Sequence, residues 1–398
     1  MKTIGMICCV FLLYAGNLLA QHKVVNIHVS SETGSPKKLL SVNIGPDKSV
    51  YGYQDCGIDQ IRTHDYYGPC DYWSYTRNAL DYNSQTIHPS FNPRSAASYQ
   101  WSDSDNKIDS IINFGFTPFF RLGISWPNNS SVPLFPPIDP SLNTFSGFAS
   151  ICLHTVKHYT DGWDNGRFYN IPYWEIWNEP DLGQKFWLGT HATPFNFFRM
   201  YSDVADSIKT FNAQLKVGGP GIAYGSMFFS KKQYREAFME YCSANSLPLD
   251  FYSWHLYDVK NPYALKAYGD TIRNLLDQNG FFNTESIITE IHPDLKGEEY
   301  NDTPKGAAWL VSAFITSNFA EIDNFFWYRG TLLGALVHPD INDAPDLKWN
   351  GLAYKAYKNF IKSAQTLVQH DGDEYVETDF TSDVNSFLTL AGMRVNLR

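Results

Sequence analysis

The chain has 398 residues, of which 43% are hydrophobic and 18% charged, so it can form one large barrel or roughly two to three smaller domains and is not a disordered chain. Its 31 basic and 41 acidic residues give a net charge of −10, which argues against nucleic acid as a partner because phosphate binding needs a basic surface. Aromatic residues make up 16% of the chain, a share that suits either a large core or contacts with flat sugar rings.

The N-terminal segment has the pattern of a secretory signal peptide. Lys2 gives a charged start, residues 4–15 form an apolar run, and Ala20 provides a cleavage site before Gln21. We therefore expect residues 1–20 to be removed and the protein to be secreted or periplasmic, with the lysosome as an alternative in a eukaryotic cell. No later stretch approaches the ~20 apolar residues of a membrane-spanning helix, so no membrane partner is expected.

Four cysteines would remain after that cleavage, in a compartment where disulfides form: Cys56, Cys70, Cys152 and Cys242. They allow three pairings if all are bridged, and the sequence does not choose among them. Cys56–Cys70 is the most local pair, and whether it forms stays open.

Eight short β-branched or aromatic runs alternate with helical patterns. The predicted strands are residues 39–44, 58–63, 117–122, 173–177, 215–218, 251–254, 286–289 and 324–327. Helical patterns lie between them, most clearly at 106–114, 195–211, 264–278 and 303–319. This alternation predicts an α/β fold, a parallel sheet closed as a (β/α)8 TIM barrel over residues 39–362.

Two connections and both ends of the chain differ from a regular barrel. The first crossover, about residues 45–57, has room only for an abbreviated helix. The long connection 66–101 is rich in Tyr, Asn, Ser and Pro, and we expect it to overlie the barrel mouth. Residues 21–38 and 363–398 are predicted to form a small, incomplete β-rich accessory region, with 24–29 pairing with strands in 374–396.

Two glutamates stand at the ends of the fourth and seventh predicted strands. The fourth strand runs into Asn178-Glu179-Pro180 and the seventh into Glu290, 111 residues later, which is the span of three barrel units. The carboxyl ends of barrel strands meet at one face, where catalytic groups lie. Two facing carboxylates can hydrolyse a glycosidic bond, one as acid and one as nucleophile or base. A single glutamate at a strand end is more often a structural ion-pair partner, but the two together favour catalysis.

Several motifs in chain order resemble glycoside hydrolase family 39, the clan A family of β-xylosidases and α-L-iduronidases. The resemblance covers roughly residues 39–362. Its segments are Ile61-Arg62-Thr63-His64-Asp65, Gly115-Phe116-Thr117-Pro118-Phe119, Trp177-Asn178-Glu179-Pro180, Lys216-Val217-Gly218-Gly219-Pro220, Trp254-His255-Leu256-Tyr257 and Ile288-Thr289-Glu290. It implies a retaining exo-glycosidase that acts on an oligosaccharide or glycoside and needs neither metal nor organic cofactor; it implies no oligomeric state.

The resemblance also assigns residue roles. Glu179 is the expected acid/base and Glu290 the expected nucleophile, while Asn178 is expected to bond the 2-hydroxyl of the sugar. Arg62 is a candidate for keeping Glu290 ionised, with a core ion pair as the alternative. We expect Glu175 to be structural. The other predicted substrate-binding residues, each with packing or a structural role as the alternative, are His64, Phe186, His255, Tyr257 and Trp327.

The sequence also departs from the family pattern. Ile291-His292 stands where the family usually has Trp-Asn after the nucleophile, which leaves the sugar contacts on that side open. The accessory β-sandwich of the family needs more than the 36 residues that follow Lys362, so a reduced sandwich and a truncated reading frame are both open. Two other functions also stay open: an endo-acting β-glycanase of the same clan, and a non-catalytic carbohydrate-binding barrel.

Overall fold

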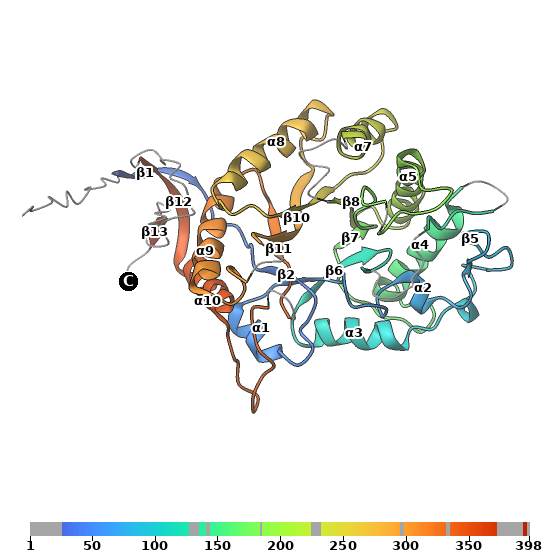
Figure 1. The fold of residues 1–398 in the computed structure, drawn as a ribbon, viewed down its shortest axis with the longest axis horizontal. Helices are drawn as coiled ribbons and strands as arrows, with labels where there is room; N and C mark the ends of the chain where they lie inside the picture. Colours follow the sequence, from blue (N-terminus) through green and yellow to red (C-terminus); the bar gives the residue numbers. More distant parts are fainter. Residues whose placement is uncertain are drawn as a thin grey trace, which may run out of the picture.

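Eight parallel strands close into a barrel with helices around it (Figure 1). The computed structural model describes residues 26–126, 135–140, 144–183, 185–223, 232–294, 298–331, 335–371 and 393–395. In barrel order the strands are β2 (Ser41–Asn43), β3 (Gln60–Arg62), β6 (Thr117–Leu122), β7 (Tyr173–Ile176), β8 (Lys216–Ile222), β9 (Phe251–Tyr257), β10 (Glu285–His292) and β11 (Asn324–Trp327). β11 pairs with β2 and closes the ring, so the predicted TIM barrel is confirmed.

The described crossover helices follow the predicted order. They are α1 (Val50–Cys56), α3 (Ser102–Asn113), α4 (Ser146–Thr160), α5 (Pro194–Phe211), α7 (Lys232–Ala244), α8 (Ala264–Gln278), α9 (Pro304–Asn318) and α10 (Trp349–Ser363). Thr193 and Thr303 cap α5 and α9 by accepting a backbone N–H, each followed by a proline at the first turn. α1 has only seven residues, as the short first crossover predicts.

The interior of the barrel changes from apolar to polar toward its carboxyl end. Near the amino end, inward-facing rings pack against each other, with the centroids of Phe119 and Phe326 4.8 Å apart and those of Phe119 and Phe251 5.2 Å apart. Toward the carboxyl ends of the neighbouring strands β3 and β10 the buried side chains include Arg62 and Glu290. The polar end is therefore the mouth, where barrel enzymes place their chemistry.

The long connection after β3 lies at this mouth. It contains α2 (Tyr72–Tyr75), a hairpin of β4 (Leu80–Asp81) and β5 (Thr86–Ile87), and η1 (Ala96–Ser98). Arg121 of β6 donates to Asp71 at 2.5 Å, and Gln85 accepts from the backbone of Thr190 at 3.3 Å. The connection is thus anchored to the third strand and to the loop that follows Glu179, as its expected position requires.

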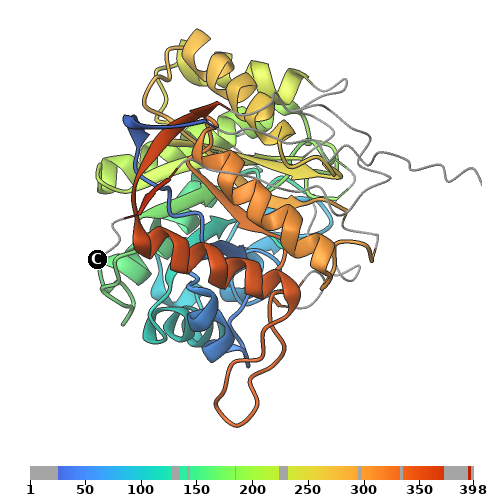
Figure 2. The same cartoon turned by 90° about the vertical axis from the view of Figure 1, so that its left-hand side faces the viewer.

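The accessory region is a three-stranded antiparallel sheet outside the barrel. Its order is β1 (Asn26–Gly34), β12 (Ala364–Asp371) and β13 (Met393–Val395). It lies beside α9 and α10 in two views (Figures 1 and 2). The N-terminal strand pairs with a C-terminal one, but its partner β12 directly follows α10 and lies before the predicted range 374–396. The signal-peptide segment and residues 372–392 lie outside the described residues.

The four remaining cysteines are free and buried, so the Cys56–Cys70 disulfide is not formed. Cys56 sits at the end of α1, where its thiol contacts the carbonyl of Gly351 at 3.5 Å. Burial raises the pKa of the Cys70 thiol to about 12. Each thiol acts as a small core side chain, a common role for cysteine. Among the described helices, none is long and apolar enough to cross a membrane.

Candidate active site

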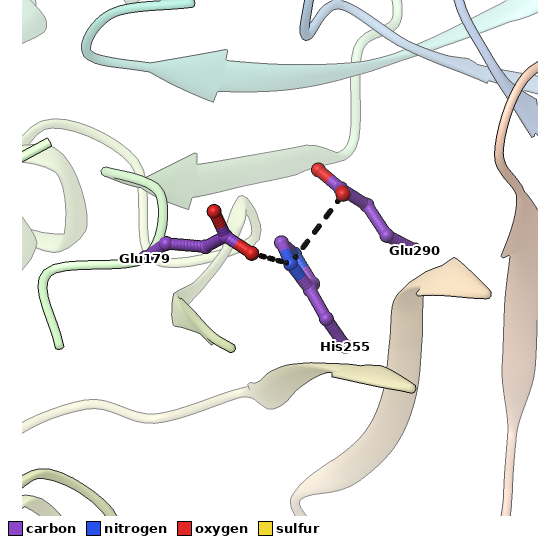
Figure 3. A group of neighbouring side chains, drawn as sticks. All are labelled: Glu179, His255 and Glu290. Atoms are coloured by element: carbon purple, nitrogen blue, oxygen red, sulfur yellow. Dashed lines mark hydrogen bonds and ion pairs between the residues drawn. The ribbon is translucent and has the colours of Figure 1, made fainter. Parts of the chain in front are cut away.

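Glu179 and Glu290 meet at the mouth of the barrel. Glu179 follows β7 with a backbone φ of +45°, and Glu290 lies within β10. One oxygen of each carboxyl and a ring nitrogen of His255 all lie within 4.8 Å of one another (Figure 3). The two glutamates are 6% and 4% exposed, so their charges interact in a largely dry environment.

Arg62 donates hydrogen bonds to four side chains of this site. Its guanidinium donates to Glu290 Oε1 at 2.7 Å and to Glu175 Oε2 at 2.6 Å. It also donates to Asn178 Oδ1 at 2.6 Å and to Asn43 Oδ1 at 3.0 Å. The fork of donors of an arginine suits several acceptors at once. The predicted contact with Glu290 is present, and Glu175 is part of the same buried network, as its expected structural role requires.

Three further side chains surround Glu290. Tyr257 donates its hydroxyl to Glu290 Oε2, His64 places Nε2 3.5 Å from Oε1, and His255 places Nδ1 3.5 Å from Oε2. Glu290 is therefore bordered by a cation and by hydrogen-bond donors, which stabilise its ionised form.

Glu179 has a different environment. Its Oε1 lies 2.8 Å from His255 Nδ1, and its backbone N–H donates to Gly221 O at 3.0 Å. Gly221 has a φ of +61°, and a Cβ there would lie 3.3 Å from His255 Nε2 and 3.5 Å from Arg62. Glycine at this position of β8 therefore lets the strand pass close behind the polar cluster.

Burial raises the pKa of both glutamates, but the neighbouring charges act differently on the two pKa values. The pKa of Glu179 lies well above its usual value because of burial, and the nearby charge of Asp181 adds to the effect. Burial also raises the pKa of Glu290, whereas His255 and Arg62 act in the opposite direction. Burial lowers the pKa of His255, while the nearby charge of Glu290 acts in the opposite direction. The arrangement therefore favours a protonated Glu179 beside an ionised Glu290.

Of the predicted sugar-binding residues, four lie in this cluster and two are packed inside. Asn178, His64, His255 and Tyr257 all contact Arg62 or one of the two glutamates. Phe186 and Trp327 were expected to stack on a sugar, but neither has a free ring face, because both residues are 0% exposed. These two side chains take the alternative role of core packing.

Their neighbours explain this packing. Phe186 lies between His64 and Trp126, with ring centroids 5.9 and 5.5 Å away. Trp327 is covered by His292, whose ring centroid is 4.6 Å away. His292, at the departure from the family pattern, is bonded to Asn301 at 3.0 Å, so it supports Trp327 from the next strand.

The sequence did not single out several residues that complete the site. Asn43, at the end of the first strand, accepts from Arg62 and donates to Thr289 O at 2.8 Å. Asp65 contacts His64, with 3.1 Å between His64 Nε2 and Asp65 Oδ1. Both follow or end barrel strands, and that position was the available signal. Trp126, Tyr328 and Arg329 also follow strands at the mouth.

The same cluster offers the only three grouped metal-ligand atoms within the part of the chain that the structure describes, from Glu179, His255 and Glu290. A cation there would compete with Arg62, which already donates to Glu290 at 2.7 Å, and with the hydroxyl of Tyr257. The donor set therefore suits acid–base and nucleophilic chemistry by the two carboxyl groups better than metal binding.

A TIM barrel that presents two buried glutamates from its fourth and seventh strands defines the class of barrels built for glycoside chemistry. Residues 46–315 match the model of glycosyl hydrolases family 39. The chain belongs to this family.

The relatives of this chain resemble it moderately in sequence. A β-xylosidase of Geobacillus stearothermophilus is 26% identical over 263 residues, which are 58% of this chain and 48% of that protein. A β-xylosidase of Caldicellulosiruptor saccharolyticus is 25% identical over 243 residues, 55% of this chain and 46% of that protein. The matches thus span about half the length of these relatives. The crystal structure of a glucosidase from Croceicoccus marinus superposes with a TM-score of 0.70 and 20% identity, covering 88% of this chain and 71% of that chain, and supports the fold.

Proposed function

We propose that this protein is a retaining glycoside hydrolase that removes a terminal sugar by a two-glutamate double displacement. The observation that carries the proposal is the pair Glu179 and Glu290, of which one oxygen each lies within 4.8 Å of the other and of which Glu290 forms an ion pair with Arg62. Retaining enzymes have carboxyl groups ~5–5.5 Å apart, whereas inverting enzymes need ~6.5–9.5 Å to fit a water. The short separation supports direct attack by one glutamate.

Each glutamate has one role in each step. Glu290 attacks the anomeric carbon while the bond to the leaving oxygen breaks, and Glu179 gives its proton to that oxygen. Glu179 then takes a proton from water, the water oxygen bonds to the anomeric carbon, and Glu290 is released as a carboxylate. Microscopic reversibility makes the second step the reverse of the first with water as the alcohol.

Asn178 is placed to bind the sugar during these steps. Its Oδ1 accepts from Arg62 at 2.6 Å, which fixes the orientation of the amide. Its Nδ2 is buried and has no protein partner among the described residues. An amide donor fixed in this way can bond the 2-hydroxyl of the sugar, a contact that strengthens in the transition state.

The substrate that we propose is a β-xyloside, because the curated relatives are β-xylosidases. Exo action is supported by the long connection 66–101, which is bonded to β6 and to the loop after Glu179 at the mouth. The two carboxyl groups complete the reaction, so we propose that no metal or organic cofactor takes part. We also propose secretion directed by residues 1–20.

A panel of nitrophenyl glycosides, with β-D-xyloside beside glucoside, arabinoside and iduronide, tests the substrate. Proton NMR of the first product tests the mechanism, and the expected result is β-xylose before mutarotation. An α-configured first product would overturn the retaining mechanism. Hydrolysis of internal bonds in xylan, without release of monomer, would overturn exo action.

A further inference from the structure

Asp65 is a buried carboxylate that the reaction described above does not use. It follows His64 at the end of β3, is 0% exposed, and has a φ of +62°, in the left-handed region that asparagine and aspartate tolerate best. Its Oδ1 lies 3.1 Å from His64 Nε2 and accepts from the backbone N–H of Trp126 at 3.1 Å. Its Oδ2 accepts from the hydroxyl of Tyr328 and lies 3.5 Å from Arg329.

These four partners come from the carboxyl ends of three different barrel strands, β3, β6 and β11. Tyr328 in turn donates its backbone N–H to Ile291 O at 3.1 Å, beside Glu290, and its ring contacts that of Tyr257 with centroids 5.7 Å apart. Asp65 thus joins three loops of the mouth, and two of these loops carry side chains that touch Glu290 or its neighbours.

The contact with His64 has a chemical consequence. His64 Nε2 lies 3.1 Å from the Asp65 carboxylate, and a carboxylate accepts but does not donate, so this contact favours the tautomer with the hydrogen on Nε2. Burial, with Arg62 next in effect, lowers the pKa of His64 well below its usual value, so the ring stays neutral and Nδ1 carries no proton. His64 then presents its Nε2–H edge to Glu290 Oε1, 3.5 Å away.

We propose that Asp65 is a positioning residue of the active site, which fixes the tautomer and orientation of His64 against the nucleophile and places a fixed negative charge behind both catalytic glutamates. This inference rests on the proposed function for its effect on catalysis. Its effect on His64 does not depend on turnover.

Asp65 lies among several charged groups, so the direction of its effect on the pKa values nearby has to be judged together with theirs. The charged and titratable groups that face this region include Arg62, His64, Arg121, Glu179, Asp181, His255, Tyr257, Glu290, Tyr328 and Arg329. Asp65 raises the pKa of Glu179 and that of Glu290, because a nearby negative charge opposes ionisation. Removing the charge should therefore lower both values.

Asp65→Asn is the isosteric test, since the amide can still accept from Trp126 and His64. Both limbs of the pH profile of kcat/KM on the active nitrophenyl glycoside should move to lower pH. The matched control is Asp250→Asn, an aspartate just before β9 at the amino end of the barrel, which accepts from Lys209 and from the backbone of Val217. It should leave both limbs in place. If neither limb of the pH profile moves in Asp65→Asn, Asp65 has only a structural role and the proposal is overturned.

Two further measurements keep the test decisive. If Asp65→Asn does not fold, Asp65→Ser also removes the charge, keeps an oxygen that can accept from Trp126, and should move both limbs to lower pH; unmoved limbs again overturn the proposal. Nitrogen-15 NMR of the histidines, with His64 assigned through His64→Gln, needs no turnover. A single Nε2–H tautomer is expected in the unmutated protein, and an Nδ1–H tautomer would overturn the positioning role. Failure of the proposed function would instead appear as absent or inverting hydrolysis in the unmutated protein.

Discussion

Arg62 and Glu290 form an ion pair with 2.7 Å between guanidinium nitrogen and carboxylate oxygen, inside the barrel, where their side chains are 0% and 5% exposed. The same guanidinium pairs with Glu175, whose side chain is 0% exposed. One cation therefore compensates two buried carboxylates, and the nucleophile proposed for the reaction is part of the packing of the core.

Removal of Arg62 should destabilise the protein strongly. Arg62→Met leaves Glu175 and Glu290 as buried charges without their cation, a loss that costs about 3–5 kcal/mol in comparable buried pairs. Chemical denaturation checks the change in the free energy of unfolding. Lys266→Met breaks an exposed i,i+4 pair with Asp270 and is the matched control, with an expected change below about 0.5 kcal/mol. Equal effects of the two substitutions would contradict the role assigned to Arg62.

The two glutamates should give different mutant phenotypes. Glu290→Ala should lose at least about 10⁴-fold in kcat on every substrate, because no glycosyl-enzyme can form. Glu179→Ala should keep its first step on dinitrophenyl glycosides, whose leaving group needs no proton, and azide should rescue it with product of retained configuration. Glu285→Gln, at the other end of β10, is the control and should behave like the unmutated protein. Exchanged phenotypes would reverse the two roles.

The pH profile should be bell-shaped, with its basic limb set by Glu179. Glu179 must be protonated for the first step, and burial raises its pKa well above the usual value, so activity should persist past the pH at which an ordinary glutamate ionises. Activity should fall at low pH as Glu290 gains a proton. The check is kcat/KM against pH for a substrate with a poor leaving group. In Glu179→Gln, assayed with a dinitrophenyl glycoside, the basic limb should disappear.

Glu179 should also reduce stability at neutral pH. A carboxyl whose pKa is raised in the folded state holds its proton there while the unfolded chain releases it, so folding stability falls as pH rises above the unfolded pKa. Glu179→Gln removes this penalty and keeps a side chain beside His255. Its Tm should therefore exceed that of the unmutated protein, and by more at pH 7 than at pH 4. The exposed Glu240→Gln serves as the control, and an equal gain at both pH values would contradict the assignment.

The barrel and its two glutamates could be predicted because local patterns determine them. Apolar runs such as 117–122 and 324–327 coincide with β6 and β11, and the spacing of Glu179 and Glu290 places them on strands that face each other. A strand end is visible in sequence because the apolar pattern stops where the polar mouth begins.

Side-chain direction could not be predicted in the same way. Trp327 was a candidate for sugar stacking, but β10 brings His292 over its ring, a contact between strands. Cys56 and Cys70 are only 14 residues apart, yet both thiols are free and buried. Asp65 has no distinctive motif of its own, and its importance comes from four partners on three strands. Such contacts depend on tertiary packing, which neither spacing nor periodicity encodes.

The pairing of β1 with β12 has a consequence for folding during synthesis. Asn26 pairs with Asp371, 345 residues away, and β2 closes the barrel only against β11, so both contacts have very high sequence separation. Loop closure over such distances is slow, and the ribosome delivers β1 long before its partner. Until then β1 is an open strand edge, the kind of surface at which chains aggregate. Recombinant production should therefore profit from weaker expression or lower temperature, which reduce encounters between chains whose β1 is still uncovered.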